Sequence, residues 1–325
     1  MQDSLFLSSV TAAPADAQDV ELARTLPPQV RLGTSSWSYP GWAGRVWDGP
    51  YSESMLARHG LAAYAAYPLF RTVCIDKGFY KPLGAAEFEK LAADVPADFR
   101  FVVKAPSLVT DALVRGSEGR GRQPNPAFLS PELAVEEFVR PALEGLGQKI
   151  GALVFQLSPL PMHMLADPGR VLERLATMLR ALPALRPLAP DGVVAVEVRD
   201  PQLLGPALAN VLRDAGATFC LGLHAKMPSI EAQLPMLRAL WPGPLVCRWN
   251  LNPVNGAYGY EDARDLYAPY DRIVDIDLPT RELLARVARA TAGAGHPVYV
   301  TVSNKAEGSA PLSVRGLAET LRAAG

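Results

Sequence analysis

From Gln29 onward the chain alternates between short apolar runs rich in β-branched residues and longer segments whose apolar residues recur every three or four positions. The first pattern is typical of β-strands covered on both faces, and the second is typical of amphipathic helices. Eight such runs are present, at residues 30–37, 71–80, 99–106, 150–157, 192–199, 217–223, 244–250 and 297–304. Their starts are separated by roughly 25 to 50 residues, which is the spacing of βα units.

Eight βα units over about 295 residues match a (β/α)8 barrel, or TIM barrel, which takes about 250 residues plus insertions. The competing fold is an open, doubly wound sheet, which normally carries a glycine-rich phosphate loop after its first strand. Here the first strand continues as GTSSWSYPGW and contains neither G-x-G-x-x-G nor a P-loop. We therefore predict a single α/β TIM-barrel domain over residues 29–325, preceded by a flexible, disordered N-terminal tail over residues 1–28.

The composition is that of a folded protein without a bulk attraction to nucleic acid. Apolar residues make up 49% of the chain, and 32 Lys and Arg stand against 33 Asp and Glu, a net charge of −1. Cys74, Cys220 and Cys247 each lie in an apolar run without C-x-x-C spacing, which predicts reduced, buried thiols. Because neither a secretory signal nor a run of about 18 apolar residues is found, we expect a cytoplasmic protein without a membrane span.

Charged and polar residues interrupt the apolar runs near their C-terminal ends, which is where TIM barrels carry their chemistry. Residues two apart in a strand share a face, so Glu197 and Arg199 lie together, as do Arg248 and Asn250. The third run ends at Lys104. Other runs place Asp76, Gln156 and Asn304 at the same level.

Two interpretations of these charges stay open. Lys104, Arg199 and Arg248 together would form a cationic pocket suited to a carboxylate or a phosphate. Alternatively, Glu197 pairs with either arginine in a buried network that only closes the barrel. The candidate catalytic groups are Glu197, Lys104 and Asp76, with Glu197 either orienting the arginines or acting as a general acid or base if burial raises its pKa.

Aromatic residues are concentrated in the loops at the same predicted rim. Trp37 and Tyr39 follow the first strand, Tyr80 follows the second, and Tyr258 and Tyr260 follow the seventh. They form either a stacking wall for a planar ligand or a hydrophobic lid that packs onto the barrel. The insertion at 107–130 contains three arginines and is either an anion-contacting flap or a solvated loop. These three are Arg115, Arg120 and Arg122.

No metal or cofactor motif is found in the sequence. The four histidines lack H-x-H, H-E-x-x-H and 2-His-1-carboxylate spacing, and only His224 lies at a strand end. No G-x-S-x-G elbow is present. We therefore expect neither a metal nor a cofactor. Glu197 and Asp76 would make a glycosidase-like carboxylate pair only at a suitable separation.

Several segments, in this order, resemble the family called domain of unknown function 72, or YecE-like: LGTSSWSYPGW, FYKP, FRFVVKAP, LVFQLSP, VAVEVRDP, the late Y-G-Y and VYVTVSNKAEGSAP. The resemblance extends over about residues 30–322. It implies a TIM barrel distantly similar to the endonuclease IV and xylose isomerase barrels, with no established activity. The family positions that the resemblance assigns to site residues are Lys104, Glu197, Arg199, Arg248, Tyr258, Tyr260 and Asn304.

The chain departs from the family pattern at several polar positions. The family's second-strand acid is Cys74 here, and Asp76 replaces its asparagine. Its two histidines after the arginines of the fifth and seventh strands are replaced by Asp200 and Asn250, and Ser303 replaces an asparagine. These replacements indicate that acid–base chemistry shared by the family is not carried over, and that this chain binds a different ligand or has lost catalysis.

Three functional hypotheses follow. The first is a barrel whose mouth binds a small anionic molecule. If such a barrel is an enzyme, we expect a metal-independent hydrolase or lyase. The second is nucleic-acid binding or processing, by analogy with the endonuclease IV-like barrels, and it predicts strongly salt-dependent affinity. The third is a non-catalytic barrel that binds a partner protein.

Overall fold

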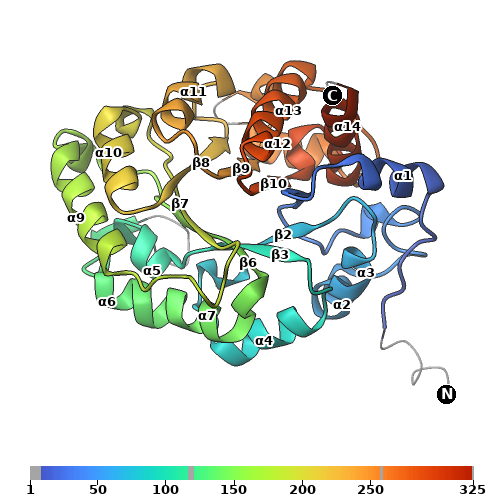
Figure 1. Ribbon diagram of the computed structural model, residues 1–325, viewed down its shortest axis with the longest axis horizontal. Helices are drawn as coiled ribbons and strands as arrows, with labels where there is room; N and C mark the ends of the chain where they lie inside the picture. The colour runs from blue at the N-terminus through green and yellow to red at the C-terminus, as the bar shows by residue number, and fades with distance from the viewer. Residues whose placement is uncertain (1–8, 116–120, 257–258, 324–325) are drawn as a thin grey trace.

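The structure is a computed structural model that describes residues 9–115, 121–256 and 259–323. Eight parallel strands form a closed barrel in the order β1-β10-β9-β8-β7-β6-β3-β2 (Figure 1). Their bounds are β1 Val30–Thr34, β2 Thr72–Ile75, β3 Arg100–Lys104, β6 Ile150–Gln156, β7 Val193–Glu197, β8 Thr218–Leu223, β9 Leu245–Trp249 and β10 Val298–Val302. The predicted single-domain α/β barrel and its eight strands are therefore confirmed.

Helices surround the barrel on its outer face (Figure 1). The α-helices are α1 Ala17–Thr25, α2 Glu53–His59, α3 Leu61–Ala65, α4 Ala85–Ala93, α5 Ser107–Thr110, α6 Pro131–Ala134, α7 Arg140–Leu146, α8 Met162–Leu165, α9 Pro168–Ala181, α10 Pro206–Asp214, α11 Ile230–Ala239, α12 Tyr260–Tyr267, α13 Leu278–Gly293 and α14 Ala310–Ala323. A π-helical stretch, η3 Val135–Val139, joins α6 to α7. Short 3-10 turns are η1 Pro40–Trp42, η2 Lys77–Phe79, η4 Gly147–Lys149, η5 Pro201–Leu203, η6 Pro253–Asn255 and η7 Asn304–Ala306.

The inside of the barrel is filled with side chains in layers, as in other TIM barrels. The middle layer is apolar and consists of Cys74, Val102, Ala152, Val154, Ala195, Cys220, Val246 and Tyr299. Near the N-terminal ends of the strands, Asp191 accepts hydrogen bonds from Arg31 at 3.2 Å and from Arg100 at 2.8 Å. Both groups of side chains occupy the barrel between its N-terminal end and the level at which the strands end.

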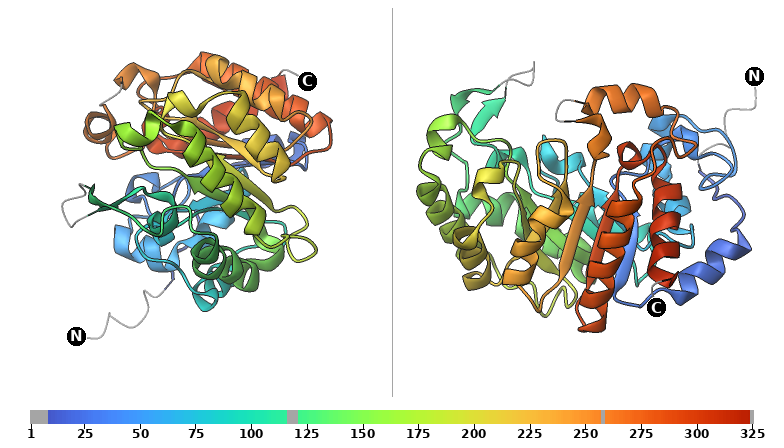
Figure 2. Two further views of the ribbon diagram at one scale, coloured as in Figure 1. Left: turned by 90° about the vertical axis from the view of Figure 1, so that its left-hand side faces the viewer. Right: turned by 90° about the horizontal axis from the view of Figure 1, so that it is seen from above.

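The segment after β3 contains an antiparallel hairpin that the sequence did not indicate. Its strands are β4 Leu113–Arg115 and β5 Gly121–Pro124. In the right-hand view of Figure 2 this hairpin and α12 stand at the same end of the barrel, where the loops after β3 and β9 begin. The side chains of Arg115, Arg120 and Arg122 lie outside the described residues.

The expected N-terminal tail is corrected by the structure at residues 17–25, which form α1 and dock against α14. Asp16 caps the helix by accepting a hydrogen bond from the backbone of Gln18. Leu22 is buried, and the fully buried Asp19 accepts a hydrogen bond of 2.6 Å from Tyr67. The mixed polarity of this segment suggested a solvated chain, but its few apolar residues lie on one face and pack against the barrel. Residues 1–8 lie outside the described residues.

Candidate functional site

The strand register brings the predicted charged residues together inside the C-terminal mouth. Gln156 and Glu197 are register partners at the ends of β6 and β7, and Arg248 of β9 is the partner of Gly222 on β8. Each of these positions lies two residues beyond a member of the apolar layer, so side-chain alternation points them into the barrel. A polar layer therefore lies directly above the apolar one.

Glu197 and Arg248 form the centre of this polar layer. Arg248 donates from Nη1 to Glu197 Oε2 at 2.7 Å and to Gln156 Oε1 at 2.8 Å. Glu197 is completely buried, and Arg248 is 3% exposed. The predicted pairing of Glu197 with an arginine is thus present, with the amide of Gln156 as a shared acceptor.

Arg199 approaches the same two acceptors from the end of β7. Its Nη2 donates to Gln156 Oε1 at 2.8 Å and lies 2.8 Å from Glu197 Oε1. Its Nε and Nη1 atoms are buried, and neither has a hydrogen-bond partner among the described residues. Buried polar groups normally find partners, so each of these two N–H groups, which lie on different edges of the guanidinium, would be satisfied by a ligand or an ordered water.

Asp76 lies at the edge of the layer, directly after β2. It accepts hydrogen bonds from Arg248 Nη2 at 3.2 and 3.3 Å, and from the thiol of Cys74 at 3.2 Å. Its side chain is 42% exposed, unlike that of Glu197. Asp76 therefore connects the buried network to the open side of the mouth.

Lys104 stands at the end of β3 and is the least engaged cation of the group. Its Nζ lies 3.6 Å from the centroid of the Phe79 ring. No hydrogen bond or ion pair joins it to any of the residues that the structure describes. Burial lowers the pKa of Lys104 to about 8; Arg248 and Arg199 add to this effect, whereas Asp76 and Glu197 oppose it.

The pKa of Glu197 differs from the expectation that burial raises it. Burial alone would raise the pKa of Glu197, but the adjacent Arg199 and Arg248 guanidiniums outweigh it and hold that pKa below its usual value. The raised pKa on which a general acid or base role of Glu197 depended is therefore not found, and the lowered pKa agrees with the alternative, orienting role. Burial opposes the charge of Arg248, yet Glu197 and Asp76 raise its pKa; for Arg199, burial and Arg248 prevail over Glu197 and lower the pKa.

Gly222 provides the space that the carboxylate of Glu197 occupies. A Cβ at position 222 would lie 3.0 Å from Glu197 Oε1 and 3.1 Å from its Cγ. Any side chain there would push Glu197 away from its arginines. This role of Gly222 could not be predicted from the sequence, because a glycine inside a strand has several structural explanations.

His224 follows β8 by one residue and lies beside the outer aromatic wall. Burial and the nearby Arg199 lower its pKa to about 4. Its Nδ1 is buried without a hydrogen-bond partner in the described part of the chain, and its ring lies 6.1 Å from that of Tyr260. Tyr260 also receives the ammonium of Lys305 on its face, at 4.3 Å. Only its strand-end position pointed to His224 in the sequence.

Two other residues that were predicted to contact a ligand form hydrogen bonds within the protein instead. Asn250 donates to the backbone of Arg248 at 3.2 Å. Asn304 accepts from the indole of Trp42 at 3.1 Å and from the backbone of Ala310 at 2.8 Å, which positions the start of α14. The oxygen of Asn304 is thus occupied by the protein.

The aromatic residues divide between packing and exposure. Trp37 is buried and donates to the carbonyl of Leu56 at 3.2 Å. Tyr39 packs 4.9 Å from Trp42, ring to ring, and burial raises its pKa. Tyr80 is 85% exposed and Tyr260 is 44% exposed. Tyr258 lies outside the described residues. The loop after β1 therefore forms a packed lid, and the exposed rings come from the loops after β2 and β9.

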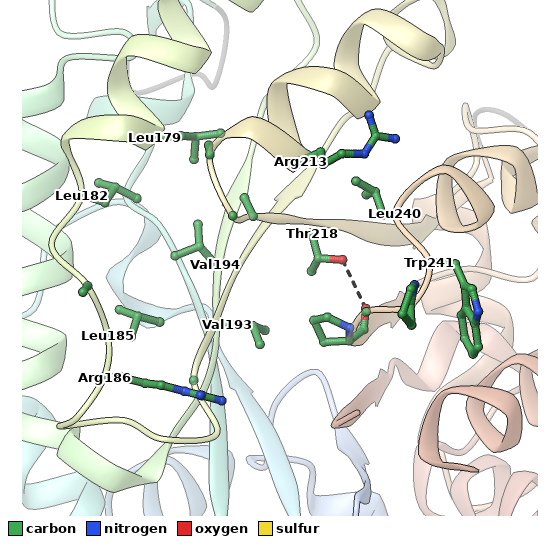
Figure 3. A pocket seen from close by; sticks show the side chains of 18 of the residues that line it. Leu179, Leu182, Leu185, Arg186, Val193, Val194, Arg213, Thr218, Leu240 and Trp241 are labelled. Carbon is green, nitrogen blue, oxygen red and sulfur yellow. Dashed lines mark hydrogen bonds between the residues drawn. The ribbon is translucent and has the colours of Figure 1, made fainter. Parts of the chain in front are cut away.

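A separate cavity of about 640 Å³ lies at the other end of the barrel, beside the starts of β7, β8 and β9 (Figure 3). It is lined mainly by apolar side chains, including Leu182, Val193, Leu240 and Trp241. None of the predicted site residues lines it.

Two searches of the described residues bear on other sites. No helix there is both long and apolar enough to cross a membrane. No group of three or more His, Cys, Asp and Glu side chains there is arranged to hold a metal ion. All three cysteines are buried and free, as the sequence predicted.

Comparison with known proteins identifies the family. Two solved structures share the fold: a DUF72 family protein of Enterococcus faecalis V583, with a TM-score of 0.55 and 16% identity over 90% of this chain and 95% of that one, and a DUF72 family protein of Thermotoga maritima MSB8, with a TM-score of 0.52 and 19% identity over 90% and 98%. No curated protein matches. The profile of the family described as "Protein of unknown function DUF72" matches residues 31–325. The chain therefore belongs to the DUF72 family.

Proposed function

We propose that the C-terminal mouth of the barrel binds a small anionic molecule that carries a phosphate or a carboxylate. The observation that carries this proposal is Arg199, whose Nε and Nη1 are buried without a partner among the described residues. The N–H groups of Nε and Nη1 lie on different edges of the guanidinium, so each is a separate donor, and a charge-assisted hydrogen bond to an oxyanion would satisfy either of them. The oxyanion would add to the hydrogen bond that Arg199 donates to Gln156 and to its ion pair with Glu197.

The balance of charge in the polar layer supports the same proposal. Arg199, Arg248 and Lys104 provide three cationic groups, against the carboxylates of Glu197 and Asp76. The ion-pair network joins two arginines to two carboxylates and is neutral in formal charge, so the additional positive charge of the layer is that of Lys104. Unpaired charge in a partly buried site is costly, and an anion bound between Arg199 and Lys104 would offset this cost. The structural network and the binding site are thus two functions of the same residues.

Within this site the residues would have distinct tasks. Glu197, held ionised by its two arginines, fixes the direction of both guanidiniums. Gln156 keeps the two arginines together by accepting from each. Arg199 and Lys104 are then the groups that face the ligand, and Asp76 lies at the open edge.

A thermal-shift titration of the full chain tests this proposal with inorganic phosphate, sugar phosphates and dicarboxylates. A ligand present at 100 times its dissociation constant stabilises the folded state by about 2.7 kcal/mol, which is a visible rise in Tm. Arg199→Ala is expected to weaken binding by about 2 kcal/mol or more. Arg264→Ala, which removes an exposed arginine of α12, is the matched control and should leave binding unchanged.

Two results would overturn the proposal. One is an absence of stabilisation by every anion, and the other is equal stabilisation of the wild type and the Arg199→Ala variant. Short oligonucleotides belong in the same screen, because nucleic-acid binding remains the second hypothesis. Its signature is an affinity that falls steeply with salt through counterion release.

A further inference from the structure

Lys104 is an amine inside the proposed anion site that the protein itself leaves uncommitted. Both arginines of the layer are anchored by Gln156 and Glu197, but Lys104 has neither a hydrogen bond nor an ion pair with any described residue. Its ammonium contacts the face of the Phe79 ring, at 3.6 Å from the ring centroid. A cation whose role was to close the barrel would be expected to contact a carboxylate, as Arg248 does.

The surroundings of this amine raise the fraction of its neutral form relative to that of an ordinary lysine. Partial burial removes water from the ammonium, and the two guanidiniums of Arg199 and Arg248 repel it. Asp76, beyond the end of β2, and Glu197 on β7 act in the opposite direction. The result is a pKa of about 8, so that about one fifth of Lys104 is a free amine at pH 7.4, compared with about one in a thousand for an ordinary lysine.

We propose that Lys104 forms a Schiff base with the ligand, which is then an aldehyde or ketone that also carries a carboxylate or phosphate. This inference rests on the proposed function, because Arg199 would hold the anionic group while Lys104 reaches the carbonyl carbon. Lysines with lowered pKa act in this way as covalent nucleophiles toward carbonyl substrates. The neighbouring cations that neutralise Lys104 are the same groups that recognise the anion.

The step is a condensation without oxidation or reduction. The lone pair of the neutral Nζ attacks the carbonyl carbon, a C–N bond forms, and the C=O electron pair moves to oxygen. Protons pass from nitrogen to that oxygen, with the carboxylate of Asp76 at the open edge as the carrier. The C–O bond then breaks and a C=N bond forms. Both hydrogens of the amine leave on the released water molecule.

Reductive trapping of the full chain tests this inference. The protein is incubated with cyanoborohydride and either pyruvate or glyceraldehyde 3-phosphate, and the modified lysines are located by peptide mass spectrometry. Lys90, exposed on α4, is the internal control. Because a lower pKa also reduces the nucleophilicity of each free amine, we expect at least about tenfold more adduct on Lys104 than on Lys90 at pH 7.4. The two probes show whether the anion is a carboxylate or a phosphate.

Variants and ligands without a carbonyl distinguish a failure of the Schiff-base proposal from a failure of the proposed anion site. Arg199→Ala should reduce trapping at Lys104, and Lys104→Met should abolish the preferred adduct. Binding of anions without a carbonyl is measured separately, on the unsubstituted chain. Lactate and glycerol 3-phosphate are such anions, matched to the two probes. If they stabilise the protein but trapping on Lys104 does not exceed that on Lys90, the Schiff base is overturned and the anion site stands. If neutral propionaldehyde labels Lys104 as well as pyruvate and glyceraldehyde 3-phosphate do, the anionic substrate class is overturned.

Discussion

Glu197 and Arg248 form a buried ion pair in which Oε2 and Nη1 are 2.7 Å apart, on two strands that are separated by β8 in the barrel. The pair reaches across the strand between them because that strand has Gly222 at the same level. A single pair of side chains thus links stability to the geometry of the proposed site.

Replacing one member of this pair should be strongly destabilising. Glu197→Gln leaves Arg199 and Arg248 without their common carboxylate, and the expected loss is about 3 to 5 kcal/mol of unfolding free energy. Chemical denaturation measures it. The control is Glu136→Gln, whose carboxylate pairs with Arg140 on the surface and should cost less than about 1 kcal/mol. Similar small losses in both variants would contradict the buried pair.

The space at position 222 is a second test of the network. Gly222→Ala places a Cβ 3.0 Å from Glu197 Oε1, so the carboxylate must shift and the fold should lose about 1 to 3 kcal/mol. Anion binding should weaken as well, since a shift of the Glu197 carboxylate would also displace the guanidinium of Arg199, with which it forms an ion pair. Gly49→Ala, where a new Cβ meets nothing within 4 Å, should change neither quantity. Unaltered anion affinity in Gly222→Ala would separate Glu197 from the binding site.

His224 predicts a pH dependence of stability. Its folded pKa of about 4 lies below the usual 6.5, so the unfolded chain binds the proton more tightly. The stabilisation is complete above pH 6.5 and is lost as the pH falls toward 4, by up to about 3 kcal/mol. His224→Gln should flatten the curve of unfolding free energy between pH 4 and 6.5. His163→Gln, at an exposed position on α8, should keep the wild-type slope.

The face of the Phe79 ring contacts the ammonium of Lys104 and stabilises its charge. Phe79→Leu removes this cation–π contact, worth about 0.5 to 2 kcal/mol, and should lower the pKa of Lys104 by about 0.4 to 1.5 further units. The pH profile of reductive trapping at Lys104 reports this shift toward lower pH. Tyr80→Leu changes the neighbouring exposed ring instead and should leave the profile in place.

The docking of α1 is tested by its buried leucine. Leu22→Ala should cost about 2 to 5 kcal/mol, because the side chain is 3% exposed and lies in the main core. Glu21→Ala, on the exposed side of the same helix, should remain within about 0.5 kcal/mol of the wild type. Equal stability of the two variants would mean that α1 is a loose tail after all.

The local sequence pattern was sufficient to predict the barrel fold and to predict that polar side chains lie near the C-terminal ends of the strands. Each strand is a short apolar run, and segments with helical periodicity precede and follow it in the sequence. Few folds other than a closed barrel accommodate eight such units. The two-residue alternation of a strand also placed Glu197 and Arg248 on the inside, since their neighbours at 195 and 246 belong to the apolar layer. The hairpin β4–β5 and helix α1 were missed because both are short and mostly polar, so tertiary contacts decide them.

Which charges pair was decided only by the closed barrel. Arg248 and Gln156 are 92 residues apart in the chain, and neither residue type nor spacing indicates that they share a hydrogen bond. The sequence by itself determined a ring of polar side chains at the strand ends, because strand periodicity is a local property. The tertiary structure alone decided that Lys104 contacts the ring of Phe79 without an ion pair to any described residue, while both arginines are anchored. The physical reason is that distances of a few ångströms between strands depend on closure, register and the absence of a side chain at Gly222.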